Sequence, residues 1–176
     1  KESLKVFEEC KNRIITMSII HEKLYESKDL AHLNLRAYLE KLTGFLNRAF
    51  NLDKDITFEI DLQDVGDIGL DTIIPIGLMV NEVVSNSLKY AFKGREKGRI
   101  EIRITKILEN KYELIIGDDG VGFDFEKQKQ LNNSFGVELI NILAEQLNGT
   151  IRTLNRPGTW YSLAFEKIDK SAAKQP

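Results

Sequence analysis

Three segments of the chain alternate strictly between apolar and polar residues, and this alternation limits the possible folds more than any other feature. Successive side chains of a β-strand point to opposite faces, so each segment predicts a strand with one buried face. The segments cover residues 56–62, 99–104 and 112–116, and a turn at Asn110 joins the last two. A sheet with one apolar face must be covered, so the chain needs a second layer.

Segments with an apolar residue at every third or fourth position supply that second layer. This spacing predicts helices over residues 33–50, 75–92 and 134–147. We place Pro75 at the first position of the middle helix, where a missing N–H costs no hydrogen bond. Elements in this order predict an α+β fold, a two-layer α/β sandwich whose mixed sheet is covered on one face by helices. Further strands are expected at residues 68–70, 150–154 and 159–165.

The N-terminal part of the chain carries a separate helical pattern. Residues 2–25 form one apolar stripe, which must bury against another element, and a helix of a second copy is the expected partner. A polar break at residues 26–31 follows. We therefore divide the chain into a helical extension at 1–30, a main domain at 31–168 and a flexible tail at 169–176. The stripe consists of Leu4, Phe7, Ile14, Met17, His21 and Leu24.

Composition excludes several classes of protein. The formal net charge of the 176 residues is −2 at pH 7, so no basic field favours nucleic acid as a partner. No apolar run approaches the length of a membrane span, so no direct membrane contact is expected. The single cysteine, Cys10, excludes an internal disulfide framework and favours a reducing, cytoplasmic compartment. The chain begins at Lys1 rather than at methionine, from which we expect a longer parent protein.

The helix predicted at residues 75–92 places a carboxylate, an amide and an amine in one row. Glu82, Asn86 and Lys89 are spaced by four and three residues, so an α-helix would bring them to one face. An amide oxygen suits Mg²⁺, a carboxylate can orient a nucleophile, and an amine can offset phosphate charge. A solvated face with a Glu–Lys pair explains the same row, and for this helix alone that simpler interpretation is favoured.

A glycine-rich corner follows the strand at residues 112–116. Asp118 shares the strand parity of Ile116, so its side chain is predicted to point to the buried side. A buried carboxylate is costly without a partner, and the exocyclic amine of a purine would satisfy it. Gly120 and Gly122 would let the backbone turn sharply and approach a ligand. An ordinary Asp-Gly turn explains the glycines, but it does not explain the inward carboxylate.

Two further segments are ambiguous when taken singly. In residues 132–137 a polar, glycine-containing run leads into a helix, whose free N–H groups can bind an anion. Ordinary N-capping explains the same residues. Gly158 and Thr159 precede the last strand, where a plain turn is sufficient. The order of the four motifs along the chain is therefore more informative than any one of them.

In this order the motifs resemble the nucleotide-binding module shared by gyrase B, Hsp90, histidine kinases and MutL, the GHKL superfamily. The likeness extends from about residue 33 to residue 167 and is greatest to the histidine kinases. It implies a Bergerat-type ATP-binding fold. The matching positions are residues 74–92 for the N box, Asp118, Gly120 and Gly122 for the G1 box, Gly136 for a G2 box reduced to one glycine, and Gly158 with Thr159 for the closing Gly-Thr.

The resemblance also implies ATP and Mg²⁺ as ligands and gives each residue a role. Asp118 would accept a hydrogen bond from the adenine amino group. Asn86 would hold the Mg²⁺ bound to the phosphates, and Glu82 would be the catalytic group near the γ-phosphate. Lys89 and Tyr90 would line the phosphate and ribose side. The remaining nucleotide contacts would come from Gly120, Gly122, Gly136, Val137 and Thr159.

The N-terminal helix narrows the subgroup. Residues 17–25 resemble the second helix of a HisKA_2-like dimerisation hairpin, whose phosphoacceptor histidine lies further upstream, and the short stretch at 124–133 resembles a short ATP lid without an F box. His21 falls in the apolar stripe and His32 at a loop–helix junction, so neither is expected to be the acceptor. The chain is therefore expected to bind ATP without phosphorylating itself. The implied partners are a second copy and a response regulator receiver domain.

The leading hypothesis is thus the ATP-binding catalytic domain of a sensor histidine kinase, which transfers the γ-phosphate to a histidine outside this chain. An anti-sigma-type serine kinase or a nucleotide-sensing regulator of the same fold is the alternative. Serine kinases of that type normally lack a dimerisation helix, and a gyrase-like ATPase would need further transducer domains. A degenerate sensor is disfavoured because Glu82, Asn86 and Asp118 are all present.

Overall fold

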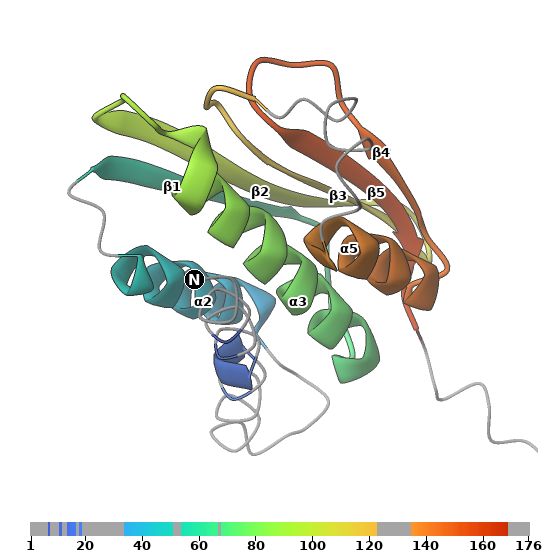
Figure 1. The fold of residues 1–176 in the computed structure, drawn as a ribbon. Helices are drawn as coiled ribbons and strands as arrows, with labels where there is room; N and C mark the ends of the chain where they lie inside the picture. The colour runs from blue at the N-terminus through green and yellow to red at the C-terminus, as the bar shows by residue number, and fades with distance from the viewer. Residues whose placement is uncertain are drawn as a thin grey trace, which may run out of the picture.

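The computed structural model contains a five-stranded sheet with helices packed against one face (Figure 1). It confirms the predicted α+β sandwich. The described residues are 7, 11, 14–16, 18, 34–50, 54–66, 68–122 and 135–168. The elements are α2 (Leu35–Ala49), β1 (Asp55–Gln63), α3 (Leu70–Asn86), the π-helical turn η1 (Ser87–Ala91), β2 (Lys97–Leu108), β3 (Lys111–Asp118), α5 (Phe135–Gln146), β4 (Thr150–Thr153) and β5 (Trp160–Glu166).

The sheet is mixed, as predicted. Its strand order is β1-β2-β3-β5-β4. β1 pairs with β2 in parallel, and the other neighbours pair antiparallel. The parallel pair requires a crossover, which α3 and η1 provide as they run across the sheet (Figure 1).

The alternating residues of β2 and β3 form the buried face of the sheet. Ile102 pairs with Ile116 and Ile104 with Leu114, and all four side chains are fully buried. Cross-strand partners share a face, so the same register places Asp118 opposite the buried Ile100. The predicted inward direction of Asp118 is therefore confirmed.

α2 begins and ends close to its predicted limits. The Asn34 side chain caps it by accepting a hydrogen bond from Ala37 N at 3.0 Å. The apolar residues of its inner face, among them Leu39, Leu42 and Leu46, are fully buried against the rest of the core. This helix therefore contributes to the layer that covers the sheet.

The start of α3 differs from the prediction in two ways. The helix begins at Leu70, so Pro75 lies inside it, and the strand expected at residues 68–70 does not form. An internal proline removes one helical hydrogen bond. The first turn forms nevertheless, because Ile73 is fully buried and Thr72 Oγ1 accepts a hydrogen bond from Ile168 N at 3.0 Å.

α2 and α3 pack closely at a single glycine. A Cβ built on Gly77 would lie 1.8 Å from the hydroxyl oxygen of Tyr38 and 2.8 Å from its Cζ. Tyr38 is fully buried, and its burial raises the pKa of the phenol. The absence of a side chain at Gly77 on α3 thus makes room for the Tyr38 ring on α2.

Part of the N-terminal segment contacts the core. Ile15 packs against the hydrophobic core, and Thr16 is fully buried. Phe7 and Ile14, two members of the predicted stripe, are 71% and 66% exposed in the single chain. The other stripe members and the predicted tail lie outside the described residues. Within the described part of the chain, no helix has the length and apolar character needed to cross a membrane.

Candidate functional site

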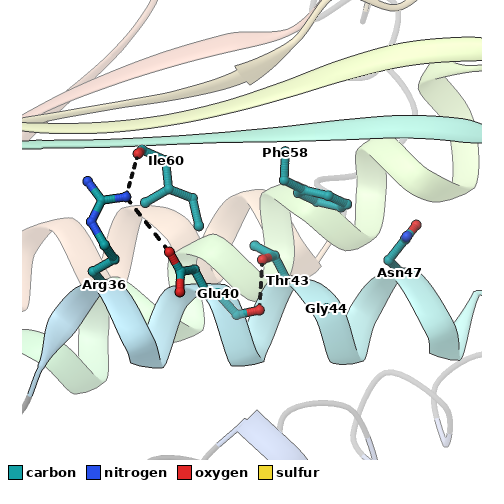
Figure 2. Close-up of a pocket in the computed structure, with 7 residues that line it drawn as sticks. All are labelled: Arg36, Glu40, Thr43, Gly44, Asn47, Phe58 and Ile60. Carbon is teal, nitrogen blue, oxygen red and sulfur yellow. Dashed lines mark hydrogen bonds and ion pairs between the residues drawn. The ribbon is translucent and has the colours of Figure 1, made fainter.

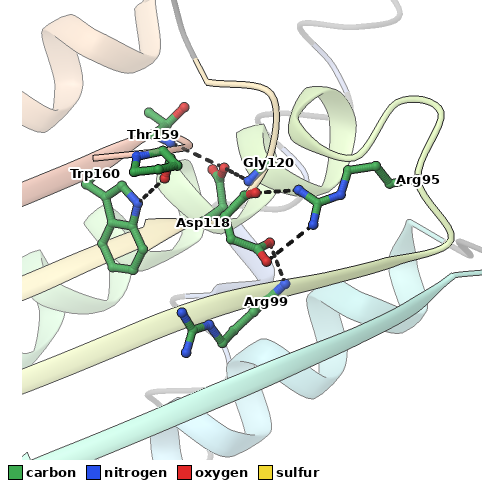
Figure 3. A network of polar contacts seen from close by, with 8 residues as sticks. Arg95, Arg99, Asp118, Gly120, Thr159 and Trp160 are labelled. Carbon is green, nitrogen blue, oxygen red and sulfur yellow. Dashed lines mark hydrogen bonds and ion pairs between the residues drawn. The ribbon is translucent and has the colours of Figure 1, made fainter. Parts of the chain in front are cut away.

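Asp118 lies at the end of β3 and is 1% exposed. Its carboxylate accepts hydrogen bonds from the main chain on Oδ1, from Gly120 N at 2.9 Å and Thr159 N at 3.3 Å (Figure 3). Oδ2 accepts a hydrogen bond from the Ser87 hydroxyl at 2.6 Å. An ionised carboxylate offers about four lone-pair positions, so these three donors leave capacity for one more on the Oδ2 side. The protein itself therefore supplies three of the hydrogen bonds that the Asp118 carboxylate needs, and a purine amine could supply only the remaining one.

The neighbouring carboxylate, Asp119, is bound quite differently. It accepts hydrogen bonds from Arg99 N at 2.8 Å and from Arg95 Nη2 at 3.3 Å, and Arg95 also donates to the Asp119 carbonyl. Asp119 is thus neutralised by an arginine at the surface. Asp118 is stabilised by neutral donors inside the fold, which leaves its negative charge available to a ligand donor.

Two glycines let the main chain approach Asp118. Gly158 has a φ of +93°, and a Cβ there would lie 1.8 Å from the Asp118 carbonyl oxygen. A Cβ on Gly120 would lie 2.4 Å from the carbonyl oxygen of Ala91, which accepts a hydrogen bond from Val121 N at 2.9 Å. The G1 corner is therefore packed between the end of η1 and the turn before β5.

Three of the predicted site residues, Glu82, Asn86 and Gly136, lie close together. A Cβ built on Gly136 would lie 3.3 Å from Glu82 Oε2 and 3.6 Å from Asn86 Nδ2. Glu82 is buried and Asn86 half-buried, on adjacent turns of α3. The first turn of α5 thus closes over a carboxylate and an amide, and a side chain at Gly136 would fill this space.

The predicted row of three residues ends at Asn86. The helix changes to π-helical hydrogen bonding at Ser87, so α-helical spacing does not apply to Lys89. Lys89 Nζ lies 5.5 Å from the centroid of the Phe50 ring. Tyr90 is 40% exposed, with Lys93 Nζ 5.6 Å from its ring centroid. Both predicted residues lie in η1, directly after the Glu82–Asn86 pair.

Several polar residues of the site were not predicted. Ser87 contacts Asp118, and Asn81 Nδ2 donates to Glu82 Oε1 at 3.1 Å. Tyr161 lies near Asp118, and its burial, together with the charge of Asp118, raises the pKa of the phenol to about 12. Asn81 and Ser87 are buried polar residues next to the predicted Glu82 and Asn86, and this adjacency was the available signal for them.

A separate hollow of about 340 Å³ lies between α2 and β1, away from these residues (Figure 2). Arg36 spans it, with Nη1 3.0 Å from the Ile60 carbonyl and 3.8 Å from Glu40 Oε1. No predicted site residue lines it. His21, His32 and residues 123–134, which include the predicted lid, lie outside the described residues. Val137 is half-buried in the first turn of α5.

Comparison with known families agrees with this geometry. The model of the histidine kinase-, DNA gyrase B- and HSP90-like ATPases matches residues 71–169, more than half of the chain. The chain belongs to this family. A second model, HisKA_2, described as histidine kinase, matches residues 1–50. The predicted resemblance is therefore confirmed at both ends of the chain.

Two kinds of curated kinase match parts of this chain. Blue-light-activated histidine kinase 2 of Erythrobacter litoralis is 27% identical over 140 residues, which are 72% of this chain and 40% of that protein. The serine-protein kinase RsbW of Listeria monocytogenes is 40% identical over 60 residues, 34% of this chain and 38% of RsbW. The chain thus spans less than half the length of these curated relatives.

Solved structures share the fold. The histidine kinase domain of a blue-light-activated histidine kinase from Erythrobacter litoralis superposes with a TM-score of 0.76 at 19% identity, over 96% of this chain and 80% of that one. The histidine kinase AdeS of Acinetobacter baumannii superposes with a TM-score of 0.60 at 16% identity, over 96% and 82% of the two chains. The two-layer fold of the ATPase family is therefore shared almost throughout.

Proposed function

We propose that the chain is the ATP-binding catalytic part of a sensor histidine kinase, with residues 31–168 as its nucleotide-binding domain. The observation that supports this most directly is Asp118, a buried carboxylate that three neutral donors hold and that retains capacity for one further donor. The adenine amino group is such a donor. A base with an exocyclic amine would therefore complete the hydrogen bonding of Asp118.

The phosphate end of the nucleotide would lie at Glu82, Asn86 and Gly136. The Asn86 amide oxygen is the hard ligand that suits Mg²⁺, which would neutralise the charge that develops on the phosphates. Gly136 leaves space above this pair, and the N–H groups of the first turn of α5, which also holds Val137, suit a phosphate oxygen. Glu82 would act near the γ-phosphate by orienting the accepting group. Lys89 and Tyr90 would flank the phosphates and the ribose.

In the parent protein the γ-phosphate would pass to a histidine outside this chain and then to a response regulator receiver domain. The match of residues 1–50 to a histidine kinase model supports dimerisation through the N-terminal region. It also favours a histidine kinase over the anti-sigma-type alternative, because the match to RsbW covers only 60 residues. We place the domain in the cytoplasm, without nucleic acid or membrane as a direct partner.

Binding of ATP in the presence and absence of Mg²⁺, measured by titration calorimetry, tests the proposal. Asp118→Ala should lower the affinity for ATP at least tenfold, while Asp119→Ala, a matched change in a surface carboxylate, should change it less than threefold. Circular dichroism must show that both variants fold. A folded Asp118→Ala variant with unchanged affinity would refute the role of Asp118. Incubation with labelled ATP should leave the chain unlabelled, and label on His21 would overturn the expectation that the acceptor lies elsewhere.

A further inference from the structure

A chain of buried polar side chains connects the N-terminal segment to the proposed catalytic carboxylate. The Thr16 hydroxyl donates to Asn81 Oδ1 at 3.0 Å, across 65 positions of sequence. Asn81 Nδ2 in turn donates to Glu82 Oε1 at 3.1 Å. The three residues are 0%, 2% and 7% exposed. Buried polar groups are retained where their hydrogen bonds are made, so this connection is a specific feature of the packed core.

The direction of these bonds fixes the orientation of the Asn81 amide. A carboxylate can only accept, so Asn81 must turn its NH₂ group to Glu82 and its oxygen to Thr16. The Thr16 hydroxyl supplies the donor that this oxygen needs. The orientation of Asn81 therefore satisfies both neighbours together, and loss of the hydroxyl removes half of that constraint.

The two oxygens of Glu82 consequently have different surroundings. Oε1 is held by Asn81, while Oε2 faces the space next to Gly136, where a Cβ would lie 3.3 Å away. Asn86 borders the same space, with Nδ2 3.6 Å from that Cβ position. Asn81 thus holds one carboxylate oxygen, while the other lies on the side of the proposed phosphate site.

We infer that Asn81 and Thr16 are positioning residues for Glu82, so that docking of the N-terminal segment sets the geometry of the phosphate site. The inference rests on the proposed function, because it takes the γ-phosphate to lie near Glu82. Loss of the Asn81 hydrogen bond removes one restraint on the Glu82 carboxylate, and a shift of its charge towards the phosphates would weaken the binding of ATP more than that of ADP. By thermodynamic linkage, ATP must in turn affect the docking of the segment that carries Thr16.

The test compares Mg²⁺-ATP and Mg²⁺-ADP affinities, measured by titration calorimetry, in variants of Thr16. Thr16→Val, which keeps the shape and removes the hydroxyl, should lower the affinity for ATP roughly three- to tenfold and that for ADP less than about twofold. Thr16→Ser, which keeps the hydroxyl, should give the same ratio of ATP to ADP affinity as the unchanged chain. Thr43→Val is the matched control, because Thr43 is also buried but its hydroxyl donates within α2, to Leu39 O at 2.9 Å.

A double variant separates positioning from a merely structural effect. In the Glu82→Gln background the side chain is neutral, so Thr16→Val should no longer change the ratio of ATP to ADP affinity. Equal losses for both nucleotides, or an effect that persists with Glu82→Gln, would overturn the inference and leave the proposed function intact. If the unchanged chain binds neither nucleotide, the proposed function fails and this inference fails with it.

A measurement without substitutions covers the case in which Thr16→Val does not fold. Amide hydrogen exchange at residues 14–16 of the unchanged chain should slow more with saturating Mg²⁺-ATP than with saturating Mg²⁺-ADP. Equal protection by the two nucleotides would contradict the coupling of this segment to the γ-phosphate.

Discussion

The hydrogen bonds of Asp118 allow the effect of Asp118→Asn on base specificity to be worked out in advance. Two main-chain N–H groups, of Gly120 and Thr159, point at Oδ1. The new amide must therefore place its oxygen there, because the opposite orientation would lose two hydrogen bonds of about 1 kcal/mol each. A difference of about 2 kcal/mol makes this orientation of the amide roughly thirtyfold more populated than the opposite one.

The NH₂ group of the variant then occupies the position of Oδ2. Ser87 can accept from it, because its hydroxyl lies 3.0 Å from the Val83 carbonyl and can donate to that atom instead. No buried group loses its partner, so we expect the fold to survive, with a loss of about 1–2 kcal/mol in the free energy of unfolding from the weaker, uncharged bonds. The NH₂ group would face the amino group of adenine, donor against donor.

The expected result is a change in base specificity. A hydrogen bond to a charged partner contributes about 1.5–3 kcal/mol, so Asp118→Asn should weaken ATP binding by roughly 10- to 150-fold. Inosine triphosphate carries a carbonyl oxygen where ATP has the amino group. The unchanged chain should therefore prefer ATP, and the variant should show a reduced or reversed preference.

Titration calorimetry with both nucleotides in the presence of Mg²⁺ measures this ratio. Asp119→Asn serves as the matched control, because the Asp119 carboxylate binds the Arg95 side chain and the main-chain N–H of Arg99 rather than the proposed base site. The reasoning is refuted if folded Asp118→Asn keeps the original ratio of ATP to inosine triphosphate affinity. A similar change of ratio in the control would assign the effect to general electrostatics instead.

Three further predictions concern packing and titration. Gly77→Ala should destabilise the fold by about 2–4 kcal/mol in urea unfolding, because the new Cβ would lie 1.8 Å from the Tyr38 hydroxyl, and Tyr38→Phe should recover part of that loss. Gly158→Ala should lower both stability and ATP affinity, by at least about 1–2 kcal/mol each, since φ is +93° and the Cβ would meet the Asp118 carbonyl; unchanged values in thermal unfolding and calorimetry would contradict this. Burial and the charge of Asp118 raise the pKa of Tyr161 to about 12, so the neutral phenol stabilises the fold below pH 10 and this contribution is lost between about pH 10 and 12. Over that range the free energy of unfolding of Tyr161→Phe, measured in urea, should fall by about 2–3 kcal/mol less than that of the unchanged chain.

Local periodicity predicted the five strands of the sheet and its covering helices, although the strand expected at residues 68–70 does not form. The alternation of Ile100, Ile102 and Ile104 determines the buried face, and the same parity predicts the inward direction of Asp118. The start of α3 was not predictable in this way. Proline favours the first turn of a helix, but burial of Ile73 and the bond from Ile168 to Thr72 extend the helix upstream, and both depend on residues distant in sequence.

The partners of the predicted site residues were the part that sequence could not supply. Asp118 is bound by Ser87, 31 positions earlier, and by Thr159, 41 positions later. Neither pairing follows from spacing within one element. The purine partner was predicted because a buried carboxylate needs a hydrogen-bond donor, whereas the fold itself brings Ser87 and Thr159 to the carboxylate of Asp118.

The junction of α3 and η1 explains how one helix serves both ends of the proposed nucleotide site. Asn86 is the last α-helical residue and lies beside Glu82 and Gly136, at the phosphate end. Ser87 is the first π-helical residue, and its hydroxyl reaches Asp118, at the base end. Consecutive helical residues point in different directions, so the two neighbours contact α5 and β3 respectively. An insertion or deletion at this junction would displace one of these residues relative to the other, so it should abolish ATP binding even where the fold persists.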